Sequence, residues 1–196
     1  MRTRSIHSAL AVIGLTAVLA SCKKGEGDPF LSVHSRKARV TGEWKMAKGQ
    51  SENTYTSSGN TTVTTTTYDG SNMTQSVVVN SGTPVTSTAT YTQNMTIDKD
   101  GTFSMTEVDD GVTTTVTGRW NFTSGVGKSS KNRERIILYY ENINSGGNST
   151  VFTGNVVPVV MEIYSLKSKE MVLQFNYSNT DANSTDTTTQ EWTYTQ

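Results

Sequence analysis

The feature that most constrains the fold is a succession of short segments rich in threonine, valine and aromatic residues, each ended by turn-forming residues. Examples of such turns are Asp69-Gly70, Ser81-Gly82-Thr83-Pro84 and Asp109-Asp110-Gly111. Residues of this composition suit a pleated, half-buried surface, and no convincing amphipathic helix lies between the segments. We therefore predict an all-β chain whose consecutive strands pair antiparallel through short connections.

The segments predict about eight to ten strands in an up-and-down meander, preceded by a short helical turn at 35–39. A meander of this size closes into a barrel or folds into two packed sheets, because an open sheet leaves reactive edges. Loops are expected at 124–133 and 178–186. The segments from which these eight to ten strands are drawn cover 40–46, 51–57, 61–69, 73–80, 84–97, a segment around Phe103 and Met105, 112–122, 135–140, 156–164, 171–177 and 187–195.

The N-terminus has the pattern of an export signal. Arg2 and Arg4 precede an apolar run over 9–20, which is typical of a cleaved signal peptide and is shorter than the ~20 residues of a permanent membrane span. The following Leu19-Ala20-Ser21-Cys22 resembles the lipobox of bacterial lipoproteins. The resemblance implies cleavage before Cys22 and acylation of its thiol, for example with palmitate. The alternative is a soluble secreted protein.

The resemblance also implies a domain organisation and a location. We expect a signal peptide at 1–21, a lipidated tether at 22–38 and a folded domain at 39–196. Lys23 stands where many inner-membrane lipoproteins carry aspartate, so we expect a lipid-anchored protein of the outer membrane, on either its periplasmic or its surface face.

The charge of the chain bears on its binding partners, and its cysteine content bears on its disulfides. All 17 acidic residues lie beyond Cys22, whereas two of the 17 basic residues lie in the signal peptide, so the mature chain is close to neutral. Nucleic-acid binding depends on clustered cations and is not expected. Cys22 is the only cysteine, so the domain has no disulfide.

A second resemblance lies at the start of the domain. Gly42-x-Trp44, on a first strand after a short helical turn, resembles the lipocalin signature, and the segment 164–175 resembles the closing strand pair of lipocalin-like domains in Bacteroidetes lipoproteins. This resemblance implies a lipocalin-like β-barrel that the tryptophan closes at one end. The chain departs from the family in its long Thr-rich hairpins at 51–92, and we find no clear counterpart of the arginine that packs on the signature tryptophan.

Two functions remain open. A barrel of about eight strands can hold one small ligand, which here would be apolar or amphipathic. Alternatively the barrel is filled, and the hairpins at 51–92 serve a structural or protein-interaction module that adds strands to another envelope protein. An empty apolar lumen favours the first function; a filled core beside unpaired hairpin edges favours the second. The candidate lining residues are Trp44, Met46, Met95, Phe103, Met105, Trp120, Phe122, Leu138, Met161, Ile163 and Phe175.

Catalytic signals are weak, and we expect no enzyme, cofactor or metal. His34 is the only histidine beyond the signal peptide and lies in the tether, which leaves the domain without a Ser-His-Asp triad or a histidine metal cluster. The phosphate-loop-like segment 125–129 is interpreted as a hairpin loop. The aspartates at 98–100 and 109–110 are interpreted as turn residues. Asp186-Thr187-Thr188 fits the O-glycosylation pattern of exported Bacteroidetes proteins, which makes Thr187 a candidate modification site.

Overall fold

The computed structural model describes residues 35–124, 134–152 and 156–196. These residues form a closed, all-β antiparallel barrel with one short helix, as the sequence predicts. The signal peptide, Cys22, His34 and the segment 125–129 lie outside the described residues. The elements are α2 (Arg36–Val40), β1 (Gly42–Ser57), β2 (Asn60–Tyr68), β3 (Asn72–Val79), β4 (Val85–Ile97), β5 (Thr102–Asp109), β6 (Val112–Ser124), β7 (Glu134–Ser145), β8 (Asn148–Val151), β9 (Val157–Leu166), β10 (Glu170–Thr180) and β11 (Ser184–Thr195).

The strands follow one another around the barrel in chain order. The sheet runs from β1 through β7, continues with β9, β10 and β11, and closes because β11 pairs with β1. The short strand β8 pairs only with the end of β7, outside this ring. Short connections between successive antiparallel strands produce this up-and-down order.

The barrel has two levels. At the lower level, residues 42–45 of β1 pair directly with residues 94–97 of β4, which excludes the β2–β3 hairpin and leaves eight strands in the ring. Further along, β1 and β4 separate and the hairpin fills the space between them. We call the eight-stranded level the base.

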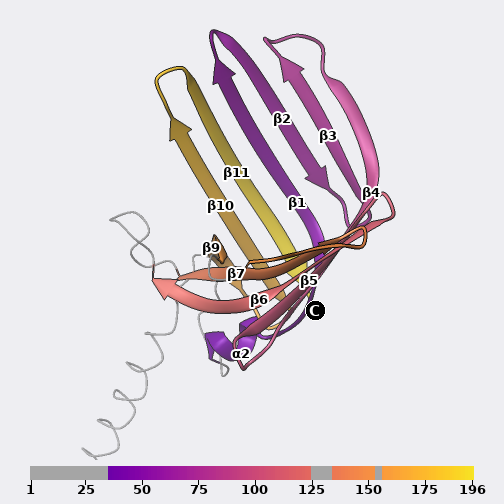
Figure 1. Ribbon diagram of the computed structural model, residues 1–196, viewed down its shortest axis with the longest axis vertical. Helices are drawn as coiled ribbons and strands as arrows, with labels where there is room; N and C mark the ends of the chain where they lie inside the picture. Colours follow the sequence, from indigo (N-terminus) through magenta and orange to yellow (C-terminus); the bar gives the residue numbers. More distant parts are fainter. Residues whose placement is uncertain (1–34, 125–133, 153–155) are drawn as a thin grey trace, which may run out of the picture.

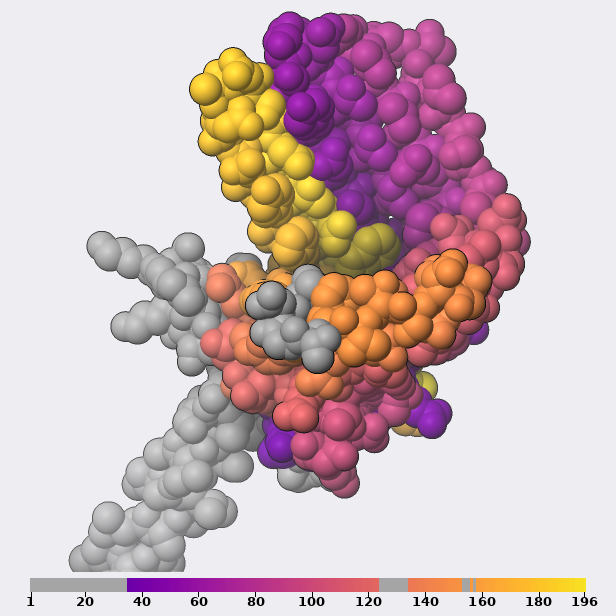
Figure 2. All heavy atoms as spheres, viewed as in Figure 1, coloured from indigo at the N-terminus to yellow at the C-terminus, as the bar shows by residue number. Residues whose placement is uncertain are grey.

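Above the base, the strands β1, β2, β3, β4, β10 and β11 continue as one curved sheet (Figure 1). It contains the hairpin β2–β3, residues 49–57 of β1, 85–90 of β4, 175–180 of β10 and 184–191 of β11. We call this sheet the wall. Figure 2 shows its hollow face, with the orange β7–β8 segment crossing in front of its lower end.

The hydrophobic core lies in the base. Alternate residues of its strands point inward, so pairs such as Trp44 and Met46, or Ile136 and Leu138, are at most 2% exposed. One contiguous core unites them with the inward-facing residues of the other strands. Burial of these side chains is the main term that stabilises the fold.

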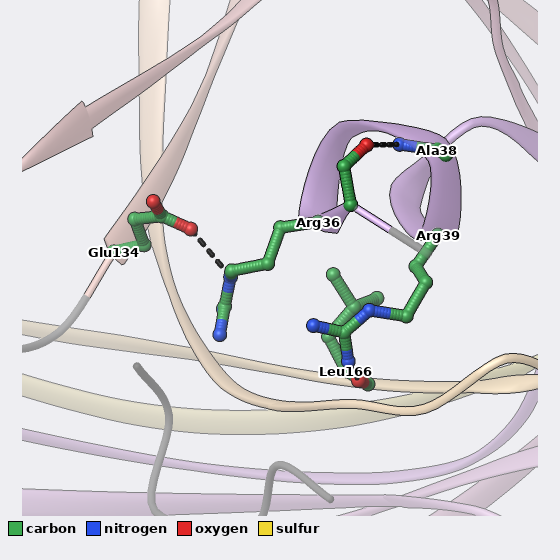
Figure 3. A network of polar contacts seen from close by, with 6 residues as sticks. Arg36, Ala38, Arg39, Glu134 and Leu166 are labelled. Carbon is green, nitrogen blue, oxygen red and sulfur yellow. Dashed lines mark hydrogen bonds and ion pairs between the residues drawn. The ribbon is translucent and has the colours of Figure 1, made fainter. Parts of the chain in front are cut away.

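The helix α2 closes the bottom of the base. Ser35 Oγ accepts a hydrogen bond from the Ala38 amide at 3.1 Å and caps the helix. Arg36 pairs with Glu134 of β7, and Arg39 donates to the carbonyl oxygen of Leu166 on β9 (Figure 3). Arg39 is therefore a buried arginine at the barrel bottom, which the sequence did not identify.

The indole of Trp44 also joins the helix to the barrel. Its Nε1 donates to the Val40 carbonyl at 2.7 Å, and both residues are at most 1% exposed. The Gly-x-Trp pattern thus places a tryptophan at the closed end of the barrel.

The structure corrects the predicted strands at three points. The strands 40–46 and 51–57 are one strand, because an irregularity between Met46 and Lys48 lets β1 bend without ending. The predicted loop 178–186 is a turn at 181–183, because β10 and β11 pair over polar residues with no apolar alternation. Strand β8 was missed for the same reason.

Candidate functional site

Most of the predicted lining residues form the core itself. Those at most 6% exposed are Trp44, Met46, Met95, Phe103, Trp120, Leu138 and Ile163. Met105, Phe122 and Met161 are partly buried and pack against them. Their side chains contact one another in one cluster, so they fill the base. Phe175 lies higher, on the wall, where its ring stacks on Tyr177 with centroids 6.5 Å apart.

A layer of hydrogen-bonded polar side chains lies directly above this core. The Tyr91 hydroxyl donates to Glu107 Oε2 at 2.8 Å, Gln93 Nε2 donates to the Tyr91 hydroxyl at 3.1 Å, and the Tyr194 hydroxyl donates to Gln93 Oε1 at 2.6 Å. Tyr91, Gln93 and Tyr194 are buried. We call these four residues the polar layer, and it connects β4, β5 and β11 across the top of the base.

Burial fixes the protonation of the two phenols. Loss of solvent raises the pKa of Tyr91, and its hydrogen bond to the Glu107 carboxylate raises it further. Loss of solvent also raises the pKa of Tyr194, with smaller contributions from Tyr140 and Glu107. Both hydroxyls therefore stay protonated at neutral pH and act as donors within the layer.

Aromatic side chains complete the top of the base beside the polar layer. The Tyr68 ring meets the Tyr91 ring edge to face, with centroids 5.5 Å apart. The Trp192 ring lies across Gly49, where an added Cβ would come within 1.8 Å of the indole. Gly49 is thus required for this aromatic packing. The Tyr68 hydroxyl is buried and has no hydrogen-bond partner among the described residues.

The two margins of the wall are free strand edges in the part of the chain that the structure describes. Residues 85–89 of β4 pair with β3 on one side only, since pairing with β5 begins at Tyr91. Residues 175–180 of β10 pair only with β11, since pairing with β9 ends at Gln174. Each edge therefore presents main-chain donors and acceptors to the surroundings.

Within 85–89 and 175–180, neither edge carries the usual protection against strand pairing, and the one nearby proline, Pro84, lies just before the first edge. Charged side chains, proline and bulges normally protect such edges, but the sequences are Val-Thr-Ser-Thr-Ala and Phe-Asn-Tyr-Ser-Asn-Thr. Val85 is 73% exposed and Tyr177 is 45% exposed. Exposed edges on the hairpins at 51–92 belonged to one of the two functions that the sequence left open. The sequence did not identify the β10 edge, because 178–186 was expected to be a loop.

Thr187, the candidate glycosylation site, lies within the wall. It is partly buried on β11 and pairs with Thr54 of β1 and Ser178 of β10. The neighbouring Asp186 accepts a hydrogen bond from Asn53 Nδ2 at 2.7 Å. Glycosylation of Thr187 stays a prediction.

One of the predicted turn aspartates, Asp100, stabilises its own turn. Asp100 Oδ1 accepts from the Thr102 amide at 2.9 Å and from its hydroxyl at 2.7 Å, and these bonds lower the Asp100 pKa. Within the described ranges, no three His, Cys, Asp or Glu side chains are grouped as metal ligands. No helix in those ranges is long and apolar enough to cross a membrane.

Comparisons with protein-family models, with curated proteins and with solved structures find no match to this chain.

Proposed function

We propose that this chain is a non-catalytic binding module that a lipid on Cys22 holds at the outer membrane, and that it binds a partner protein by strand addition at the wall. The observation that carries the proposal is the pair of free, uncharged edges at 85–89 and 175–180. An added strand satisfies the main-chain groups of such an edge and gives affinity without a deep pocket.

The proposed partner is an extended, uncharged polypeptide segment. The edge residues carry hydroxyl, amide, aliphatic and aromatic side chains and no charge, which pair best with segments of similar character. A charged segment would gain no ion pair at either edge.

The packing of the base favours this function over a small ligand in the lumen. The residues that would line the lumen pack against one another, and the polar layer lies between them and the hollow face of the wall. An apolar ligand would have to displace both sets of contacts.

The edges can be tested by photo-crosslinking in the native envelope. A photoreactive residue at Thr88 of β4 or Ser178 of β10 should crosslink to a second polypeptide, whereas one at Thr67 of β2 should not. Thr67 is a matched control because it is exposed on the same sheet but lies on an interior strand. Thr88→Lys and Ser178→Lys should reduce crosslinking, since an edge lysine opposes strand addition.

Equal crosslinking from all three positions, or none from the two edge positions, would overturn the strand-addition proposal. The anchor is tested separately by labelling cells with a palmitate analogue. The wild-type chain should incorporate the label and Cys22→Ser should not; a labelled Cys22→Ser chain would refute the lipid anchor.

A further inference from the structure

The wall carries a pocket on the face opposite the core side chains. The pocket is open to solvent on one side, has a volume of about 360 Å³ and is lined by residues of β1, β2, β10 and β11. Paired residues of antiparallel strands point to the same face. Gln50 pairs with Glu191, which pairs with Gln174, whereas the neighbouring pair of Trp192 and Leu173 faces the core.

The lining is entirely polar. The side chains on this face are the amides of Gln50, Gln174 and Asn176, the hydroxyls of Thr65 and Thr189 and the carboxylates of Glu52 and Glu191, while Ser51 and Gln190 border the pocket from positions that point to the core face. The lining contains no apolar, aromatic or basic side chain. This composition disfavours a lipid, which needs apolar walls, and an anion, which Glu52 and Glu191 would repel. The lining instead favours an uncharged ligand that can both donate hydrogen bonds to amides and hydroxyls and accept hydrogen bonds from them.

We propose that this pocket binds a neutral saccharide. Each amide both donates and accepts, as each sugar hydroxyl does, so a row of amides matches a polyhydroxylated ring. The Gln174 amide holds the Glu191 carboxylate at 2.8 Å, and Lys48 lies two residues before Gln50 on the same face of β1. Both reduce the attraction of the pocket for a cation.

The pocket volume fits this class of ligand. Binding pockets for small molecules enclose roughly 300–1,000 Å³, and this pocket lies at the lower end of that range. Asn176 belongs both to the pocket lining and to the β10 edge. The saccharide proposal uses the side chains of the lining and not the main-chain groups of the edge, so it does not rest on the proposed strand addition.

The test is saturation-transfer NMR with the full-length protein in a detergent that lacks a sugar headgroup. The probes are maltotriose and chitotriose, with the anionic trimer of galacturonic acid for comparison. At least one neutral probe should bind saturably, and the acidic trimer should not. Gln174→Ala should weaken binding about fivefold to tenfold, the effect of losing one good hydrogen bond.

Two further variants make the test specific. Asn176→Ala removes a second lining amide without touching the Gln174–Glu191 hydrogen bond and should also weaken binding severalfold. Gln75→Ala, on an interior strand and facing the other side of the same sheet, should leave the dissociation constant unchanged. Failure of both neutral probes to bind, stronger binding of the acidic trimer, or an equal effect of Gln75→Ala would overturn the proposal.

Discussion

The base and the wall share the strands β1, β4, β10 and β11 but are stabilised differently. In the base, β1 places Trp44 and Met46 into an apolar core. In the wall, the same strand carries Ser51, Asn53 and Tyr55 on that face. The base therefore gains its stability from apolar burial, whereas the wall depends on main-chain pairing and polar side-chain contacts.

The side-chain contacts of the wall connect neighbouring strands. Thr56 and Thr61 hydroxyls lie 3.1 Å apart, and those of Thr74 and Thr88 lie 3.2 Å apart. Cross-strand pairs of this kind contribute about 0.2–1 kcal/mol each. A strand can therefore extend beyond the hydrophobic core of the base while one of its ends stays fixed in that core. Its outer part is then the less stable part.

The largest expected effect follows from truncating the base. Leu173 is fully buried, so Leu173→Ala should lower the free energy of unfolding by about 2–5 kcal/mol. Val77→Ala in the wall should lower it by less than about 1 kcal/mol. Urea unfolding measures both, and equal losses would break the distinction between base and wall.

The next largest loss of stability is expected at Gly49, where β1 passes from the base into the wall. Gly49→Ala places a Cβ into the Trp192 ring and should lower the free energy of unfolding by about 1–3 kcal/mol. In a Trp192→Ala background the same change should cost much less. If its cost is the same in both backgrounds, the indole is not what requires glycine at this position.

Alkaline pH should weaken the polar layer specifically. The pKa values of Tyr91 and Tyr194 are raised in the folded state, while unfolded tyrosines ionise near pH ~10. The unfolded chain therefore loses protons that the folded chain keeps, and stability is lost as pH rises above about 10, by up to about 1.4 kcal/mol per pH unit for each phenol.

Replacing one phenol tests this dependence. Tyr194→Phe should make the free energy of unfolding fall less steeply between pH 10 and 11. Urea titrations at each pH provide the measurement, and an unchanged slope would contradict the assigned burial.

The smallest expected effect is at the tip of the wall in acid. The amides of Asn183 and Ser184 donate to Asp181 Oδ1 at 2.8 and 2.7 Å, which lowers the pKa of this exposed aspartate. The turn is therefore stabilised above about pH 4 and loosens as pH falls through the folded pKa. NMR amide exchange at 183–184 should increase in acid, whereas Asp181→Asn should lack this pH dependence.

The sequence predicted the base better than the wall. Alternation around Trp44, Phe103 and Trp120 identified strands whose inward faces the structure buries, because apolar alternation reports burial directly. The last residues of β10 and the first of β11 carry no such alternation, and they pair by continuing the register that the two strands already have in the base. The β10 edge was therefore missed.

Long-range contacts limited the prediction of the sites. Arg39 is buried because α2 meets the end of β9, and the polar layer joins residues up to 101 positions apart. The pocket on the wall is lined by residues of four strands. No local sequence pattern predicts which of these distant residues contact one another. The sequence therefore indicated the types of residue in each site but not which residues form it together.

Native-state hydrogen exchange tests most directly whether a stable, closed base supports a less stable, open-edged wall. We expect amides at 94–97 and 171–173 to exchange only through global unfolding. Amides at 85–89 and 175–180, including those bonded to β3 and β11, should exchange about a hundredfold faster or more. Equal protection of the two groups would contradict the account, because it would mean that the wall is as stable as the base and that its edges are covered.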